Sequence, residues 1–183
     1  MQKQLKLVTL LILVGGLLVI FSNSTFRMPG NQQNYEPIQP IDFSHRLHAG
    51  EMEVPCQYCH YGASQSRHAG IPATNVCMNC HKYVSATRDD LRLEEEQASV
   101  EGRDMKPLTS LEIIKIYSAM GYDPQGNPVE GKAGKSVEWV KVHNIPDFVF
   151  FSHKPHITAG VDCADCHGDV SSMERIKQTE DLS

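Results

Sequence analysis

The sequence predicts a mostly irregular and helical fold with little sheet, preceded by one apolar N-terminal helix. The chain of 183 residues has a single long uncharged run, from Leu7 to Phe26, and few long apolar runs after it. Proline and glycine interrupt the segment 41–84 often, and a pentapeptide of the form CxxCH occurs three times in the chain. A domain with so few apolar runs has little material for a core of its own, which indicates that a bound group fills much of it.

The chain divides into three predicted regions. Residues 1–27 are expected to form a transmembrane anchor, because the twenty uncharged residues from Leu7 to Phe26 just span a bilayer core. Neither a small-x-small cleavage site nor a lipobox cysteine follows the run, although a cleaved signal peptide is the alternative. Residues 28–40 are predicted to be a linker rich in Gln, Asn and Pro, and residues 41–183 to form one main domain.

Local patterns predict the elements of the main domain. The charged run 88–97 is typical of a solvated helix face. A helix is predicted to begin at Thr109, which forms a capping box with Glu112, and to end at Gly121. Residues 123–135, rich in Gly, Pro and Asn, predict a loop, and the apolar and aromatic segment 137–151 is expected to pack against the bound group.

The three CxxCH motifs carry the chemistry, and they use every cysteine in the chain. In a c-type haem attachment site the two thiols bond to the porphyrin vinyl groups, and the adjacent histidine binds the iron. The motifs therefore predict three haem c groups and a multihaem cytochrome c fold whose core the haems form. The attachment residues are Cys56, Cys59, Cys77, Cys80, Cys163 and Cys166, and the proximal ligands are His60, His81 and His167.

Two other uses of the cysteines are disfavoured. Cys59 and Cys77 enclose 17 residues, a spacing that also suits a four-cysteine zinc site. A zinc site does not need a histidine after each second cysteine, and it leaves the third motif unexplained. A disulfide framework has no need of the histidines either, and it is typical of shorter secreted chains.

A repeated histidine motif precedes two of the CxxCH motifs. FSHxxH occurs at residues 43–48 and again at 151–156, and it ends seven residues before Cys56 and six before Cys163. This internal repeat indicates that a distal iron ligand is supplied just upstream of its haem. The candidate distal ligands are His45, His48, His153 and His156, together with His68 between the first two motifs. His143 lies outside the repeat and is interpreted as a core or surface hydrogen-bonding residue.

The order FxHxxH then CxxCH resembles the class III multihaem cytochromes. In that class the first histidine of the pair usually binds the nearby haem, and the second reaches another haem. The resemblance implies that His45 binds opposite His60 and His153 opposite His167, and it makes His68 the best partner for His81. His48 and His156 are then in excess.

A closer resemblance covers nearly the whole chain. The chain resembles the pentahaem cytochrome c subunit of alternative complex III. The resemblance rests on the N-terminal run and on three segments that follow it in order: PIDFSHRLHAGEMEVPCQYCH, SRHAGIPATNVCMNCH and WVKVHNIPDFVFFSHKPHITAGVDCADCHG. That resemblance implies an electron-transfer subunit of a quinol:electron-acceptor oxidoreductase in a respiratory or photosynthetic chain. Its expected partners are an iron–sulfur subunit, polytopic quinol-oxidising membrane subunits and a periplasmic electron acceptor or oxidase. The subunit itself conducts electrons and does not catalyse.

The chain departs from that family in haem number, because it shows three CxxCH motifs where the family has five. Three haems need three distal ligands, whereas five candidate histidines are present. The excess of two matches the two absent motifs, which favours a longer product with further motifs after Ser183. The alternative is that His48 and His156 serve haems or other groups differently here.

Charge and composition bear on the remaining functional classes. Beyond Lys3 and Lys6 the chain carries 22 acidic residues against 15 basic ones, a net charge of about −7, which disfavours nucleic-acid binding. The two lysines predict a cytoplasmic N-terminus and a haem domain on the periplasmic side of a bacterial cytoplasmic membrane. A membrane-anchored periplasmic electron shuttle is the first alternative. A multihaem reductase is a second one, but it needs an open iron position that surplus histidines argue against.

Overall fold

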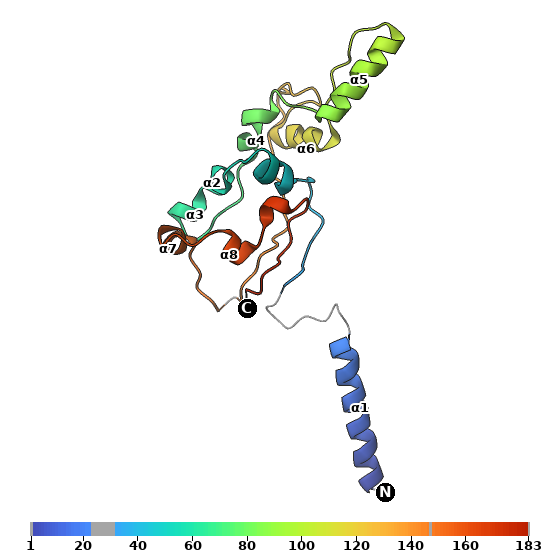
Figure 1. Cartoon of the computed structure of the whole chain (residues 1–183), viewed down its shortest axis with the longest axis vertical. Coiled ribbons are helices and arrows are strands. Elements are labelled where there is room, and N and C mark those ends of the chain that lie inside the picture. The colour runs from blue at the N-terminus through green and yellow to red at the C-terminus, as the bar shows by residue number, and fades with distance from the viewer. Residues whose placement is uncertain (1, 23–31, 147, 183) are drawn as a thin grey trace.

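A computed structural model of the chain describes residues 2–22, 32–146 and 148–182. These residues form short helices joined by long irregular segments, as Figure 1 shows. Within the described ranges there is no strand, and the one β-bridge pairs Tyr122 with Pro128. The helical and irregular character of the fold is as the sequence predicts. The helical elements are α1 (Gln2–Ser22), η1 (Arg46–Glu51), α2 (Cys56–Cys59), α3 (Gly62–Gln65), α4 (Thr74–His81), α5 (Arg88–Glu101), α6 (Leu111–Met120), α7 (His153–Thr158), α8 (Ala164–His167) and η2 (Val170–Ser172).

The predicted transmembrane anchor is wrong for the described residues. None of their helices combines the length and the apolar character that a membrane crossing requires. The first residues of α1 include two lysines and two glutamines, so its uncharged part begins only at Leu7. The single-pass membrane localisation inferred from this helix is corrected with it.

Residues 32–40, predicted to be part of a linker, pair with distant segments of the chain. The backbone of Asn34 donates to the carbonyl of Gln178, and the Gln178 amide donates back to Tyr35, at 2.6 and 3.1 Å. The side-chain amide of Gln39 bonds in both directions with the backbone of Val140. The predicted boundary between residues 27 and 28 lies outside the described residues.

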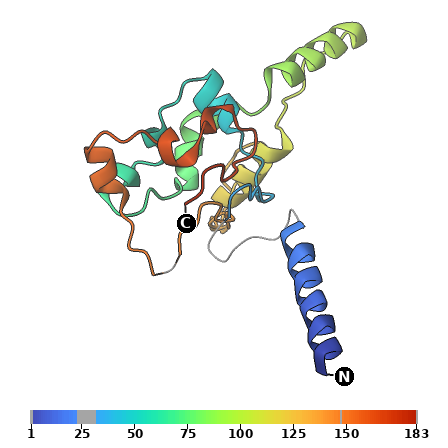
Figure 2. The ribbon, with the colours of Figure 1, turned by 60° about the horizontal axis from the view of Figure 1, so that its bottom comes forward.

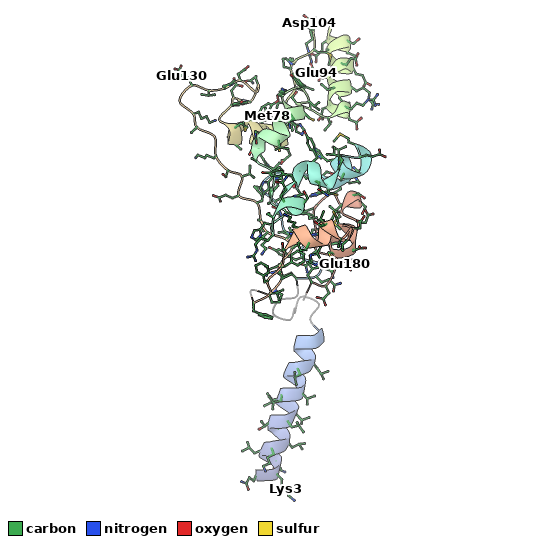
Figure 3. All side chains as sticks on the ribbon, turned by 90° about the vertical axis from the view of Figure 1, so that its left-hand side faces the viewer. Lys3, Met78, Glu94, Asp104, Glu130 and Glu180 are labelled. Carbon is green, nitrogen blue, oxygen red and sulfur yellow. The ribbon has the colours of Figure 1, made fainter. Side chains whose placement is uncertain are left out.

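A small apolar core lies between α4 and α6. Ile113, Ile116 and Tyr117 come from one face of α6, and they meet Met78 of α4 and Ile41. Helix α6 is the helix predicted to begin at Thr109, but Ser110 is its N-cap, accepting a hydrogen bond from the amide of Ile113. Gly121 ends it in the left-handed conformation, as predicted. Figure 3 labels Met78 in this region.

The core supports the second CxxCH motif directly. The Tyr117 hydroxyl donates to the backbone carbonyl of His81 at 2.7 Å, and Cys77 packs against the core from α4. Trp139, from the segment predicted to pack on the bound group, also lies against this core. By contrast Phe148 and Phe150 of the same segment are largely exposed, and Phe150 lies beneath the guanidinium of Arg67. The second motif is thus built on a core to which α6 contributes most, and Ile41 joins the chain just before the first FSHxxH segment to the same core.

Helix α5 is the solvated helix that the charged run predicts. It extends away from the haem-motif helices in Figure 1, and Thr87 caps its first turn by accepting from the amide of Asp90. The segment after α5 runs back along the helix. Its Arg103 makes two hydrogen bonds, of 2.5 and 3.2 Å, to the buried carboxylate of Glu94 in α5. Glu94, labelled in Figure 3, also accepts from the Lys106 amide. This bidentate ion pair attaches the returning segment to α5.

The two halves of the haem-motif region pack through short elements. Helix α3, just after the first motif, packs against α7, which begins with the second FSHxxH unit, and η1 packs against η2 (Figure 2). The backbone amides of His153 and Lys154 donate to the carbonyls of Arg67 and Ser66 at 3.2 Å. Residues far apart in the sequence are therefore brought to one small region.

Candidate haem-binding centre

Each CxxCH motif lies on about one turn of helix. The first motif forms α2 with His60 as its C-cap, the second ends α4, and the third forms α8 with Cys163 at its N-cap. Residues three apart on a helix share a face, so the two thiols of each motif point to the same side. All six cysteines are free thiols. This arrangement suits two thioether bonds to one edge of a porphyrin.

Two pairs of histidine rings have the separation expected of two imidazoles bound to one metal ion. With each nitrogen about 2 Å from the metal, and each ring centre about 1 Å further away, the centres lie about 6 Å apart. The rings of His153 and His167 are 6.4 Å apart and nearly parallel, at 5°. The rings of His48 and His81 are 6.1 Å apart, with an angle of 58° between their planes. The residues of the second and third sites therefore fit a haem iron held from both faces.

Hydrogen bonds select the nitrogen that remains available in three of these four rings. Nδ1 of His48 lies 2.8 Å from the Ser44 carbonyl, that of His81 lies 2.9 Å from the Val84 carbonyl, and that of His153 lies 2.7 Å from the Arg67 carbonyl. A carbonyl only accepts, so the proton is on Nδ1 and the lone pair on Nε2. This is the usual outer-shell arrangement for a metal-binding histidine.

The two FSHxxH units have the same local geometry. Phe43 stacks on His48 at 4.3 Å and 24°, and Phe151 stacks on His156 at 4.8 Å and 28°. Each phenylalanine also meets the first histidine of its unit edge to face, at 4.9 Å in both cases. His156 bonds to Ser152 through Nδ1 at 2.8 Å, as His48 does to Ser44. The sequence repeat is therefore a structural repeat that sets the direction of two imidazoles.

The first site is held differently from the other two. His60 donates from Nδ1 to the carbonyl of Gly70 at 2.6 Å, which leaves its Nε2 available. Burial lowers the pKa of His45 to about 4, and the charges of His60 and His48 add to the effect. Nδ1 of His45 is buried without a hydrogen-bond partner. His45 is thus near enough to His60 for their charges to interact, but its Nδ1 has no carbonyl partner such as the one that holds His60.

His68 and His143 differ from the expectations placed on them. His68, the expected partner of His81, is exposed, and the ring next to His81 is that of His48. His143, set aside as outside the repeat, packs edge to face on His167 with ring centres 4.3 Å apart. Burial lowers the pKa of His143 to about 4, followed by the charges of His167 and His45, and its Nε2 has no partner. The sequence signal for this residue is its position within the apolar and aromatic segment 137–151 that leads into the second repeat.

The donor groups do not form a compact multi-ligand site of the kind that zinc uses. In the part of the chain that the structure describes, no three His, Cys, Asp or Glu side chains gather so as to hold a metal ion. A structural zinc site requires four such ligands around one ion. A haem iron takes four nitrogens from the porphyrin and needs only two from the protein, which is the arrangement that the paired rings provide.

Motifs, paired imidazoles and free thiols together support the class of multihaem cytochromes c, with haem c as the cofactor. No family model matches the chain. The chain is 30% identical over 129 residues to the multihaem cytochrome c subunit of menaquinone reductase from Nitratidesulfovibrio vulgaris, strain Hildenborough. The match covers 70% of this chain but 45% of the relative, so the chain spans less than half the length of that protein. The similarity supports the multihaem cytochrome c class and does not single out alternative complex III.

Proposed function

We propose that this chain is an electron-transfer subunit that carries haem c within an oxidoreductase complex acting on a quinone. The observation that carries the proposal is the near-parallel pair of His153 and His167, at the separation expected of two axial ligands on one iron. The relative named above, itself a subunit of a menaquinone reductase, supports the link to quinone chemistry. When bound, haem supplies an iron that gains and loses one electron.

Within this proposal the chain attaches three haems through its cysteine pairs and binds each iron from both faces. His48 takes the position opposite His81, in place of His68, and His153 takes the position opposite His167. His45 binds opposite His60, supported by the electrostatic interaction between them. Carbonyl groups fix the rings of His48 and His153 before haem arrives, which limits the freedom lost on coordination.

His156 is proposed to bind the iron of a further haem, attached outside residues 1–183. Its ring is oriented by the same two contacts that orient His48, yet no histidine ring of a CxxCH motif is paired with it as His81 is with His48. A haem carried by another segment or another subunit would complete its coordination. The resemblance to alternative complex III implies five haems, which are the three of this chain, the one bound by His156 and one more. His68 is the candidate iron ligand for that fifth haem.

The proposed role is conduction, not catalysis at a haem. Two protein ligands on each iron leave no open position for a substrate such as nitrite. The reductase alternative would need one site with a single imidazole. The second and third sites each have two, and His45 is beside His60 in the first. The shuttle alternative is not addressed by coordination, because an isolated carrier needs the same ligands.

The finer proposal is membership of alternative complex III or of a related quinone-linked complex. Its partners would be an iron–sulfur subunit and polytopic subunits that react with the quinone, with a cytochrome, a small metalloprotein or an oxidase as the final acceptor. Among the described residues, two open hollows of about 650 and 540 Å³ lie beside α6 and α5.

Haem staining after denaturing electrophoresis tests the cofactor, and purification of the tagged chain from its own cells tests the complex. We expect three haems per chain of residues 1–183, and two after the paired change Cys77→Ala/Cys80→Ala. Zinc without haem would overturn the whole proposal. Copurification of iron–sulfur and polytopic subunits supports the complex, whereas a haem-loaded chain isolated alone supports the shuttle.

A further inference from the structure

The thiols of the three motifs are not arranged in space as they are along the chain. Cys163 of the third motif is hydrogen-bonded to Cys56 of the first. Cys77 of the second motif lies near Cys59, the other cysteine of the first motif. The first motif therefore has a neighbouring cysteine in each of the other two motifs.

Hydrogen bonds that do not involve the cysteines also place the first motif between the segments of the other two. On one side of the first motif, the Asn79 side chain of α4 donates to the hydroxyl of Tyr58 in α2 at 2.9 Å. On the other side, the backbone and ring of His153 both donate to the carbonyl of Arg67, just after the first motif. The segment that carries the first haem thus contacts α4 in one direction and the distal ligand of the third haem in the other.

The packing of the helices agrees with these contacts. Helix α3, just after the first motif, packs against α7, which begins at His153. In Figure 1, α2 lies between α4 and α8.

We infer that the first haem site is the middle one of the three, with the second and third sites on either side of it. The inference rests on the proposed binding of three haems, and it adds their spatial order, which is second, first, third. The first haem is then the only one with two close neighbours in this chain. Electrons that pass between the second and third sites depend on the first, although its motif comes first in the sequence.

Three variants of the haem-loaded chain test this order, each lacking one attachment pair. They are Cys56→Ala/Cys59→Ala, Cys77→Ala/Cys80→Ala and Cys163→Ala/Cys166→Ala. The measurement is the magnetic coupling between the two remaining oxidised haems, seen as broadening and faster relaxation of their electron paramagnetic resonance signals. We expect the coupling to persist without the second or the third haem and to be lost without the first.

The second and third variants decide the question even if the first does not fold. If the second haem were central, coupling would be lost in the Cys77/Cys80 variant, and if the third were central it would be lost in the Cys163/Cys166 variant. Either loss, with two haems shown by staining to be present, overturns the inference. A wild-type chain without covalent haem would instead overturn the proposed function, so the two failures are distinguishable.

A second measurement keeps all three haems attached. His48→Ala and His153→Ala should each make one outer iron high-spin, and a high-spin iron speeds the relaxation of its nearest low-spin neighbour. With the first haem in the middle, the same low-spin signal is affected in both variants. Different signals in the two variants would show that the outer sites do not share a neighbour, and the inference would fail.

Discussion

Replacing His48 with alanine tests the axial pairing that the structure introduced. His48 lies 6.1 Å, ring to ring, from His81, so its loss should leave the second haem with one protein ligand. With two of three haems unchanged, about one third of the iron should become high-spin and bind carbon monoxide. The thioether bonds to Cys77 and Cys80 should remain, so the haem count after denaturing electrophoresis should not change.

The same substitution has a second effect, on the stability of the polypeptide. It removes the hydrogen bond from His48 to the Ser44 carbonyl, worth about 1 kcal/mol. It also removes the stacking on Phe43, worth about 1 kcal/mol. We therefore expect the free energy of unfolding to fall by about 2 kcal/mol, while the chain still folds and its haem spectrum can be recorded.

Two matched variants serve as controls for His48→Ala. His156→Ala removes the same kind of stacked and hydrogen-bonded imidazole from the second repeat, so it should cost similar stability without opening any of the three haems. His68→Ala should leave the spectrum unchanged. A high-spin signal in His68→Ala together with a fully low-spin His48→Ala protein would refute the pairing and restore the one expected from the class III resemblance.

The remaining predictions concern other single groups. His153→Ala should open the third iron, giving a high-spin signal and carbon monoxide binding at a site different from that in His48→Ala, and a spectrum unchanged from wild type would contradict the near-parallel pair. Tyr117→Phe should cost about 1 kcal/mol in urea unfolding, because the His81 carbonyl loses its hydroxyl partner, and it should not change the haem count. The pKa of Glu94 is lowered from 4.5 to about 2 by its hydrogen bonds from Arg103 and from the Lys106 amide. The contribution of the ionised carboxylate to the stability of the folded chain is therefore complete above about pH 4.5 and is lost as the pH falls through 2. The protection of α5 amides from hydrogen exchange, taken relative to the intrinsic rate at each pH, should fall over that range. Glu94→Gln should remove this pH dependence, and an unchanged pH profile in that variant would show that the ion pair is not responsible.

Several elements were predictable because their causes are local. The helix from Leu111 to Met120 follows from an apolar face and a terminal glycine, and only its cap differed, moving from Thr109 to Ser110. The predicted membrane anchor was wrong because an uncharged run alone does not establish a helix that can cross a membrane, and none of the described helices meets that requirement.

The proposed haem-attachment residues can be predicted from the sequence because the two thiols and the imidazole of each motif lie within about one helical turn. The repeat also determined how each FSHxxH unit orients its rings, since phenylalanine, histidine and the carbonyl that accepts from it lie within six residues. Which iron each imidazole faces was decided only by tertiary structure. Ile41, just before the first FSHxxH unit, packs with Met78 of α4, and α3 packs on α7. The ring of His48 lies beside that of His81, and the ring of His153 beside that of His167. Those separations depend on contacts between segments remote in the chain, and spacing along the sequence does not specify such contacts.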